Sequence, residues 1–267
     1  MAGLSKVAGL GSGNCDFELQ IAKQLLQREP VSFEMHCHEI NPSMLDRGKE
    51  LIHREGFLNH FRFRECDMNR VEFDQAYDVF IANHSLHHFV NLEHIFQSIR
   101  TAMRPNGYFI VNDMIGRNGH MLWPEAYEIL SQVWSSLPKE KKLNHQNRMY
   151  EETYQNWDYS KNGFEGIRAQ DILPLLIKSF HFELFCPFSS IVDLFIGRCF
   201  GHNFNPDNSK DRAFIDYVAH LDETCIREGK IKPTHLIAWM VLEKPQKAQF
   251  MDGLTPEGCV RIPSPGD

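Results

Sequence analysis

The stretch Val7-Ala8-Gly9-Leu10-Gly11-Ser12-Gly13-Asn14-Cys15-Asp16 lies close to the start of this 267-residue chain. Its apolar beginning and glycine-rich middle predict a strand, a tight turn and the start of a helix. Glycines at positions 9, 11 and 13 allow positive φ and let backbone N–H groups come close to a ligand. The stretch therefore predicts a turn that holds a nucleotide-like cofactor, although ordinary tight turns contain glycine clusters as well.

The composition of the chain limits the classes of protein to which it can belong. Its hydrophobic fraction of 42% and mean hydropathy of -0.38 fit a globular fold. No segment approaches the roughly 18 apolar residues of a membrane span, and the chain does not begin with a signal-peptide pattern. A net charge of -7 without a long basic run argues against a nucleic-acid partner, and seven scattered cysteines fit a reducing compartment. We therefore expect a cytoplasmic protein with a small-molecule substrate.

The segment after the glycine turn predicts a helix and a second strand. Apolar residues keep helical spacing from Phe17 to Arg28, and Val31 to His38 form a strand that ends at Glu39. In a doubly wound sheet, a carboxylate at the end of the second strand accepts hydrogen bonds from the two ribose hydroxyls of a nucleotide. Glu39 therefore predicts ribose binding, with a solvated strand end as the alternative.

Strands and helices continue to alternate as far as residue 113. Three further strands are predicted, at Phe61–Glu65, Tyr77–Ala82 and Tyr108–Val111, the last after a turn at residues 104–107. Right-handed crossovers place the carboxyl ends of these parallel strands at one rim, where ligands bind. The sequence thus predicts a Rossmann-like, doubly wound α/β sheet.

Residues 4 to about 113 resemble the cofactor half of a class I S-adenosylmethionine-dependent methyltransferase. Besides the glycine turn and Glu39, the resemblance is carried by Asp67-Met68 after the third strand and by Asn83-His84 after the fourth. The stretch Leu86-His87-His88-Phe89, followed by a helix and an Arg-Pro-Asn-Gly turn, is also typical of these enzymes. The resemblance implies S-adenosylmethionine as the cofactor.

The resemblance also implies which residues contact that cofactor. The turn would pack against its methionine part, Glu39 would hold the ribose, and Asp67 would hydrogen-bond the adenine amino group. Met68 would lie beside the adenine ring, and Asn83 would run along the cofactor toward the substrate. The full implied set is Gly9, Gly11, Ser12, Gly13, Glu39, Ile40, Asp67, Met68 and Asn83.

Two features depart from the pattern of the family. Gly9 stands where the family usually has an acidic residue, and Cys15 stands where it has the last glycine. The acidic group at the amino end of the cofactor then comes from elsewhere, for example Asp16, or is absent. Many relatives also carry an N-terminal helical segment over the cofactor; here either the insertions supply a lid or the sequence is one part of a longer protein.

Residues 114–166 form a first insertion that is unusually rich in aromatic residues. They contain three of the four tryptophans and four of the seven tyrosines, with a helix predicted from Pro124 to Trp134. Two accounts stay open: a helical subdomain with its own aromatic core, or rings that line a pocket for a sugar or a flat aromatic substrate. Gly163 and Gly166 are candidate hinges before a helix over Arg168–Phe180.

The rest of the chain predicts the closing strands of the sheet. Strands at His181–Phe188 and Thr234–Lys244 would form an antiparallel hairpin, separated by a second insertion at residues 189–233 with a helix over Asp211–Glu228. We therefore expect one domain over residues 1–244, with both helical insertions over the cofactor rim. Residues 245–267, rich in Pro and Gly, are expected to form a loosely ordered tail.

Three residues at the rim are candidates for the chemistry. Methyl transfer is an in-line displacement, and an attacking alcohol must also lose a proton. His87 and His88 follow the fourth strand and suit a general base, while Asp113 ends the fifth strand and could orient a histidine or bind a substrate hydroxyl. The alternatives are structural histidines at a helix start and a strand-end cap.

The triplet His36-Cys37-His38 does not predict a metal site. On a strand, residues 36 and 38 face one way and Cys37 the other, and no nearby Cys or His pair completes a set of four ligands. We expect no bound metal there and interpret Cys37 as a small buried hydrophobe.

The sequence as a whole indicates an S-adenosylmethionine-dependent methyltransferase acting on a small molecule or glycan, most simply at oxygen. A nicotinamide-dependent oxidoreductase is a rival, but its fingerprint has glycine at the position of Asp16 and gives Asp67 no role. A non-catalytic scaffold or partner subunit with the same fold is a second rival.

Overall fold

The computed structural model describes residues 4–28 and 32–265 and is dominated by a large sheet. Its strands are β1 (Ser5–Leu10), β2 (Phe33–Glu39), β3 (Phe61–Glu65), β4 (Tyr77–Asn83), β5 (Met103–Met114), β8 (His181–Phe188), β9 (His235–Val241) and β10 (Gln249–Phe250). They lie in the order β10-β8-β9-β5-β4-β1-β2-β3. Every pairing is parallel except those of β9 with β5 and β8.

This topology confirms the predicted fold, a doubly wound, mostly parallel sheet closed by an antiparallel hairpin. Strand β9 alone runs antiparallel to its neighbours. Strands β1 to β5 are parallel to one another, so their carboxyl ends lie at one rim. The segment 104–107, predicted as a turn, lies within β5 as an irregularity of its pairing with β4, between the Tyr77 and Val79 partners. Residues 29–31, where the second strand was expected to begin, lie outside the described residues.

Helices cover both faces of the sheet, because successive strand residues point to opposite faces and many on each face are apolar. On one face α1 (Asp16–Arg28) and α2 (Pro42–Arg54) bury a core that includes Val7, Met35 and Ile81. On the other face α3 (Leu92–Ala102) and α5 (Ala169–Ser179) pack on Ala8, Phe80 and Phe109. The glycine turn joins β1 to α1 and therefore lies at the rim, between the sheet and that helix.

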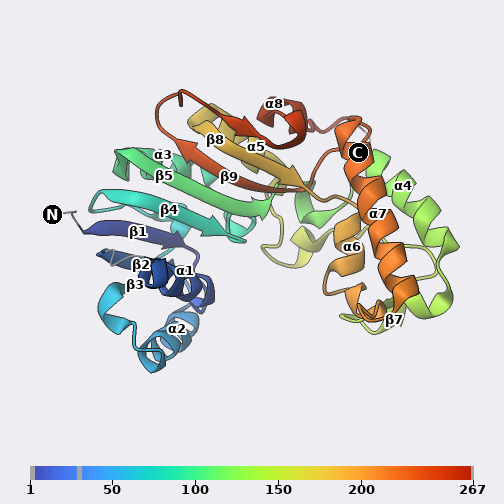
Figure 1. The fold of residues 1–267 in the computed structure, drawn as a ribbon, viewed down its shortest axis with the longest axis horizontal. Helices are drawn as coiled ribbons and strands as arrows, with labels where there is room; N and C mark the ends of the chain where they lie inside the picture. Colours follow the sequence, from blue (N-terminus) through green and yellow to red (C-terminus); the bar gives the residue numbers. More distant parts are fainter. Residues whose placement is uncertain (1–3, 29–31, 266–267) are drawn as a thin grey trace.

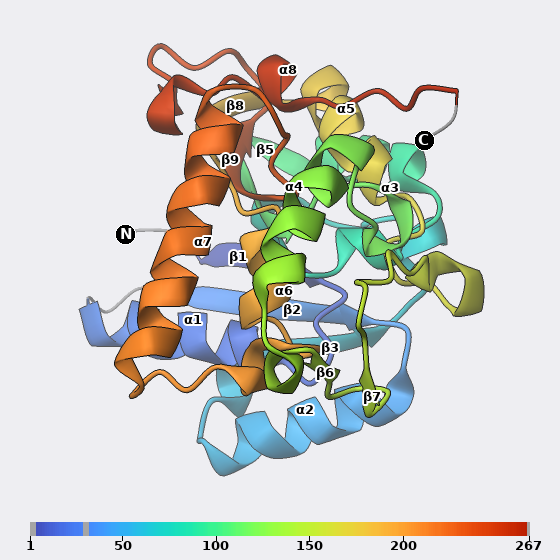
Figure 2. The ribbon, with the colours of Figure 1, turned by 90° about the vertical axis from the view of Figure 1, so that its right-hand side faces the viewer.

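The two insertions fold together into one helical unit. It contains α4 (Pro124–Ser136), α6 (Val192–Ile196), α7 (Ser209–Arg227) and a short hairpin of β6 (Leu143–Asn144) and β7 (Met149–Tyr150). Leu130 and Trp134 of the first insertion share a buried core with Phe195, Phe200 and Val218 of the second. In Figure 1 this unit lies beyond the carboxyl ends of the parallel strands, and in Figure 2 α4 and α7 stand in front of the sheet. The sequence analysis expected two insertions over the rim but not their common core.

Residues 245–265, expected as part of a loosely ordered tail, instead hold regular structure. Strand β10 pairs with the edge strand β8, and α8 (Pro256–Cys259) contributes Cys259 to the main core. Arg261 pairs with Glu125 of α4 and lies over the Trp123 ring. A Pro- and Gly-rich composition thus did not prevent packing, because a few apolar and charged side chains find partners. No helix in the described residues is long and apolar enough to cross a bilayer.

Candidate functional site

Two of the three glycines of the turn have the positive φ that the sequence analysis expected, whereas Gly9 lies within β1 and has no positive φ. Gly11 and Gly13 have φ of +66° and +53°. A Cβ on Gly11 would stand 2.9 Å from Cβ of Ser85, so only glycine fits this turn. Cys15, at the position of the family's last glycine, also has a positive φ of 60° and is buried.

Glu39 connects the end of β2 to this turn. Its Oε2 accepts a hydrogen bond from the Gly13 N–H at 3.0 Å, and its Oε1 accepts one from Asn41 N–H at 2.9 Å. Each carboxylate oxygen keeps a further lone pair. Ile40 beside it is an exposed apolar side chain, with 59% of its surface accessible. The carboxylate and the exposed Ile40 lie next to each other at the rim.

A buried carboxyl that the sequence analysis missed lies beneath the turn. Oε1 of Glu18 stands 2.5 Å from the point where a Cβ on Gly9 would lie, and Oε2 is buried without a hydrogen-bond partner among the described residues. Burial raises the pKa of Glu18 to about 7. Asp16, the candidate for the displaced acidic group, is exposed. The signal was present in the sequence, because Glu18 shares the apolar face of its helix with Ile21, Ala22 and Leu25.

Asp67 and Met68 follow β3 but point differently. Asp67 caps a short 3-10 helix (Met68–Arg70), and its Oδ1 accepts hydrogen bonds from N–H and Nδ2 of Asn69, both at 2.9 Å. The Asp67 side chain is 36% exposed. Met68 is 3% exposed and packs in the main core, so its side chain faces away from the rim. Only the backbone of Met68 is left to border a ligand.

The end of β4 leads to a left-handed turn at the rim. Asn83 accepts a hydrogen bond from Nδ2 of Asn112 at 2.8 Å, which ties the ends of β4 and β5 together. His84 has a φ of 49° and is exposed. The next residues form a 3-10 helix at Leu86–His88, which turns His87 and His88 toward the helical unit.

Asp113 and His87 form a buried pair at this rim. Oδ1 of Asp113 lies 2.5 Å from Nδ1 of His87, and Oδ2 accepts hydrogen bonds from N–H of Ser85 and Leu86 at 2.8 and 2.7 Å. Burial alone would raise the pKa of Asp113, but the His87 ring and the backbone N–H groups lower it below its usual value. Since an ionised carboxylate only accepts hydrogen bonds, Asp113 accepts the Nδ1–H of His87, and in the neutral form of the ring Nε2 carries the lone pair.

Three more ionisable side chains lie around His87. The His88 ring lies against it, tilted by 47° with ring centroids 4.0 Å apart, and its Nδ1 donates to the carbonyl of Phe164 at 3.0 Å. His120, on a left-handed residue with φ of 56°, places Nε2 3.3 Å from Oε2 of Glu165. The same Glu165 oxygen lies 3.9 Å from Nε2 of His87. Burial, and then the neighbouring His87, lower the pKa of His120. His120 and Glu165 are in the first insertion, and nothing in the sequence pattern singled them out.

These side chains open into a cavity of about 680 Å³ between the rim and the helical unit. The rim contributes His84, His87, His88 and Met114, and the insertions contribute His120, Asn144, Gln146, Glu151, Tyr154, Trp157, Tyr159, Glu165, Asp193, Arg198, Cys199 and Phe200, among others. Such a volume holds a molecule of several rings or sugar units. Trp134 fills a core, as the first account of the aromatic insertion expects, and Trp157 lines the cavity, while its role toward a substrate stays a prediction.

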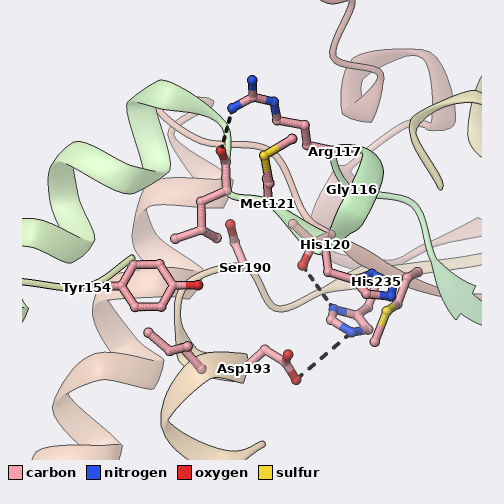
Figure 3. A pocket seen from close by; sticks show the side chains of 12 residues that line it. Gly116, Arg117, His120, Met121, Tyr154, Ser190, Asp193 and His235 are labelled. Carbon is pink, nitrogen blue, oxygen red and sulfur yellow. Dashed lines mark hydrogen bonds and ion pairs between the residues drawn. The ribbon is translucent and has the colours of Figure 1, made fainter. Parts of the chain in front are cut away.

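A smaller recess continues from this cavity toward β9. It shares Met114, His120, Tyr154, Asp193 and Leu194 with the large cavity. Figure 3 shows the Tyr154 ring directed into the recess, with Asp193 and His235 joined by a dashed line on its opposite side. Thr234 Oγ1 lies 3.0 Å from Nδ1 of His235, and burial lowers the pKa of His235.

The residues 36–38 do not form a metal site in the described structure. Nε2 of His36 lies 2.8 Å from Glu34, and Cys37 is fully buried in the sheet. Within the described residues, one group has the spacing of metal ligands, namely His87, His120 and Glu165, whose ligand atoms lie within 4.8 Å of one another.

The comparisons with known proteins agree with this geometry. A family model described as "Methyltransferase domain" matches residues 4–174, so the chain belongs to that family. The resemblance to class I S-adenosylmethionine-dependent methyltransferases is thereby confirmed, and the nicotinamide alternative has no support. No curated protein sequence matches the chain.

Solved structures with the same fold differ widely from it in sequence. One is the O-methyltransferase of a trans-AT polyketide synthase multienzyme of Brevibacillus brevis, with S-adenosyl-L-homocysteine bound: 15% identity over 96% of this chain and 70% of that one, TM-score 0.50. Another is geranyl diphosphate C-methyltransferase of Streptomyces coelicolor A3(2), with Mg²⁺, geranyl diphosphate and S-adenosyl-L-homocysteine: 11% identity over 90% and 74%, TM-score 0.52. At these identities the likeness shows the fold.

Proposed function

We propose that the protein transfers the methyl group of S-adenosylmethionine to a hydroxyl of a small molecule or glycan bound in the rim cavity. The observation that carries the proposal is the His87–Asp113 pair, in which Asp113 binds Nδ1 of His87 and the His87 side chain lines a cavity of about 680 Å³. An alcohol must lose its proton to attack, whereas an amine or phenolate needs positioning only. A buried, oriented imidazole is therefore better explained by an alcohol acceptor.

The predicted cofactor residues support the binding half of this proposal. Gly11 and Gly13 allow the close approach of a ligand, Glu39 has free lone pairs for ribose hydroxyls, and Asp67 has a partly exposed carboxylate for the adenine amino group. Of the predicted set, only the Met68 side chain turns away from the rim. We keep Gly9 in the set as the base of the turn, with Glu18 behind it.

The reaction that we propose is an in-line displacement in which His87 accepts the proton. The acceptor oxygen attacks the methyl carbon, the carbon–sulfur bond breaks, and its electron pair stays on sulfur to give S-adenosylhomocysteine. The hydroxyl proton passes to Nε2 of His87, and the ionised Asp113 stabilises the imidazolium that results. Asp113 touches no reacting atom in this scheme and acts by positioning His87. His88 lies at the same wall and is the alternative proton acceptor.

The insertions support a small molecule or glycan as the acceptor. Tyr154, Trp157 and Tyr159 line the cavity, and aromatic rings of this kind stack on sugar rings and flat aromatic groups. The polyketide O-methyltransferase and the geranyl diphosphate enzyme of the same fold also act on small molecules, by their descriptions. The net charge of -7 gives no support for a nucleic-acid acceptor.

Two measurements test the proposal in sequence. Titration calorimetry should show binding of S-adenosylmethionine and no binding of NAD(H). Methyl-labelled S-adenosylmethionine is then incubated with the protein and fractionated small-molecule, glycan, protein and RNA pools, and the labelled product is analysed by mass spectrometry. We expect a labelled methyl ether, and His87→Gln should lower its rate of formation by about 100-fold or more at unchanged cofactor affinity. Label on nitrogen or carbon only, or a His87→Gln enzyme with full rate, would contradict the proposed chemistry.

A further inference from the structure

The side chains of His87, His120 and Glu165 converge on one point in the wall of the cavity. They come from distant parts of the chain: the turn after β4, a 3-10 helix at Asn118–His120, and the loop before α5. Oε2 of Glu165 lies 3.3 Å from Nε2 of His120 and 3.9 Å from Nε2 of His87. In a tetrahedral zinc site with ordinary bond lengths, neighbouring ligand atoms lie about 3.4 Å apart. All three ligand atoms lie within 4.8 Å of one another, so small side-chain movements would bring them to the separation of zinc ligands.

The surroundings of His87 match those of a metal-binding histidine. Such a histidine almost always donates its second ring N–H to a carboxylate, which fixes the ring and leaves the other nitrogen for the metal. Asp113 does this at Nδ1 of His87 and is itself fully buried and held by backbone N–H groups. Asp113 and the backbone N–H groups that bind it thus hold the His87 ring in one orientation. Surface residues that lie together by chance lack such supporting contacts.

The backbone around His120 also keeps that ring in place. His120 adopts a left-handed conformation, the Gly119 N–H donates to the carbonyl of Gly166 at 2.9 Å, and a Cβ on Gly166 would stand 3.0 Å from the His120 ring. The Ile167 N–H donates to the carbonyl of His87 at 3.1 Å. These contacts join the loop that carries Glu165 to the segments that carry both histidines.

We propose that His87, His120 and Glu165 bind one divalent transition-metal ion of the zinc type, with a fourth position open to the cavity. Two imidazoles and a carboxylate suit zinc and not magnesium, which prefers oxygen ligands. The remaining position faces the place where an acceptor would lie. The ion would bind in the acceptor cavity and would not contact the predicted cofactor residues.

The proposed ion would compete with the proposed reaction, and this consequence rests on the proposed function. Metal binding uses the lone pair on Nε2 of His87, which is the pair that accepts the acceptor's proton. One Nε2 cannot hold a metal and a proton at the same time. A bound zinc ion therefore inhibits methyl transfer until it is removed, and the site is a metal-responsive control of the enzyme.

Zinc binding is measured directly on the full chain, freed of metal with a chelator and without acceptor. Zinc sulfate is titrated in competition with a chromophoric chelator, and cobalt chloride gives the coordination number from its visible spectrum. We expect one zinc per chain at this site and an intense four-coordinate cobalt spectrum. Glu165→Gln and His120→Asn should each weaken zinc binding at least tenfold.

The chain offers a closely matched control. His84 lines the same cavity, also has a positive φ (49°), and lies outside the three-residue group. His84→Asn therefore repeats the His120→Asn change on a similar backbone, and Asn tolerates left-handed geometry. It should leave zinc affinity within about twofold. Glu165 is 54% exposed, so Glu165→Gln keeps the test valid if a histidine variant does not fold.

Two results would overturn the metal site: a wild-type protein that binds no zinc, or zinc binding that is unchanged in both Glu165→Gln and His120→Asn. The proposed function is judged apart from this, by calorimetry with S-adenosylmethionine and by methyl transfer from the chelator-treated protein. If these succeed and zinc does not bind, only the metal site fails. If zinc binds and no methyl is transferred, the metal site stands and the proposed reaction fails.

Discussion

The carboxyl group of Glu18 occupies the space that a side chain at position 9 would fill, with Oε1 of Glu18 2.5 Å from the ideal Cβ position of Gly9. An acidic side chain at position 9, where the family usually has one, would therefore occupy the same space as the Glu18 carboxyl group. In this chain the carboxyl group at this end of the turn comes from α1 and not from β1. The glycine turn is atypical in sequence without losing the acidic neighbour.

This relationship predicts that Gly9 and Glu18 are energetically coupled. Gly9→Ala should destabilise the protein by about 1–3 kcal/mol, because its Cβ would overlap the buried Glu18 carboxyl and also Ser12 Oγ, which lies 2.7 Å from the same position. Glu18→Ala removes the first overlap and leaves the second, so the double variant should be more stable than the sum of the two single changes by about 1 kcal/mol. Urea unfolding of the four proteins measures the cycle.

A control for this cycle is Gly163→Ala. Gly163 has no atom within 4 Å of its Cβ position and an extended backbone with φ of 174°. The substitution should leave the free energy of unfolding within about 0.5 kcal/mol of the wild type. Additive effects of Gly9→Ala and Glu18→Ala would show that the two residues do not share one space.

The buried Glu18 also predicts a pH dependence of stability. Its pKa rises from 4.5 in the unfolded chain to about 7 in the folded protein because of burial, so the folded state binds the proton more tightly. Stability from this group is fully present below about pH 4.5 and is lost as pH rises through about 7, by about 3 kcal/mol. Glu18→Gln cannot titrate, and its stability relative to wild type should therefore improve between about pH 5 and pH 8. The same relative stability at both pH values would mean that Glu18 is ionised in the folded protein throughout.

Much of the cofactor half could be predicted from the sequence because its signals are local. The turn at Gly11 and Gly13, the acid Glu39 and the pair His87–His88 each follow a strand whose apolar pattern is readable, and parallel strands bring their ends to one rim. The cavity could not be predicted in this way. Its wall depends on how residues 114–166 and 189–233 pack on each other, and that packing is set by contacts across the chain such as Trp134 with Phe200.

The errors of the sequence analysis have the same physical origin. Asp16 was the nearest acid in the sequence, but helix geometry turns Glu18 inward and leaves Asp16 in solvent. Met68 follows Asp67 directly, yet its side chain packs in the core. His120 stands alone in the sequence and becomes a neighbour of His87 only when the first insertion folds back to the rim.

Asp67 is predicted to recognise the adenine of the cofactor. Asp67→Ala should weaken S-adenosylmethionine binding about tenfold, which corresponds to the loss of one hydrogen bond to a charged group. Calorimetry measures the dissociation constant, and circular dichroism checks the fold. Glu72→Ala is the matched control, because Glu72 is an exposed acid in the same loop that the proposal does not use. Equal affinities of the wild type and Asp67→Ala would remove Asp67 from the cofactor site.

Trp157 is predicted to bind the acceptor and not the cofactor. Its side chain is 53% exposed and lines the large cavity, where it offers a ring face for stacking. Trp157→Ala should raise KM for the acceptor about tenfold or more, since a stacked aromatic contact contributes about 1–3 kcal/mol, while kcat and the affinity for S-adenosylmethionine change little. Tyr150→Ala is the control: Tyr150 is 55% exposed, lies on β7 in the same insertion and does not line the cavity. Steady-state kinetics with the acceptor found by the labelling experiment measure both variants. If KM for the acceptor is unchanged in Trp157→Ala, Trp157 does not bind the acceptor, which must then lie elsewhere in the cavity.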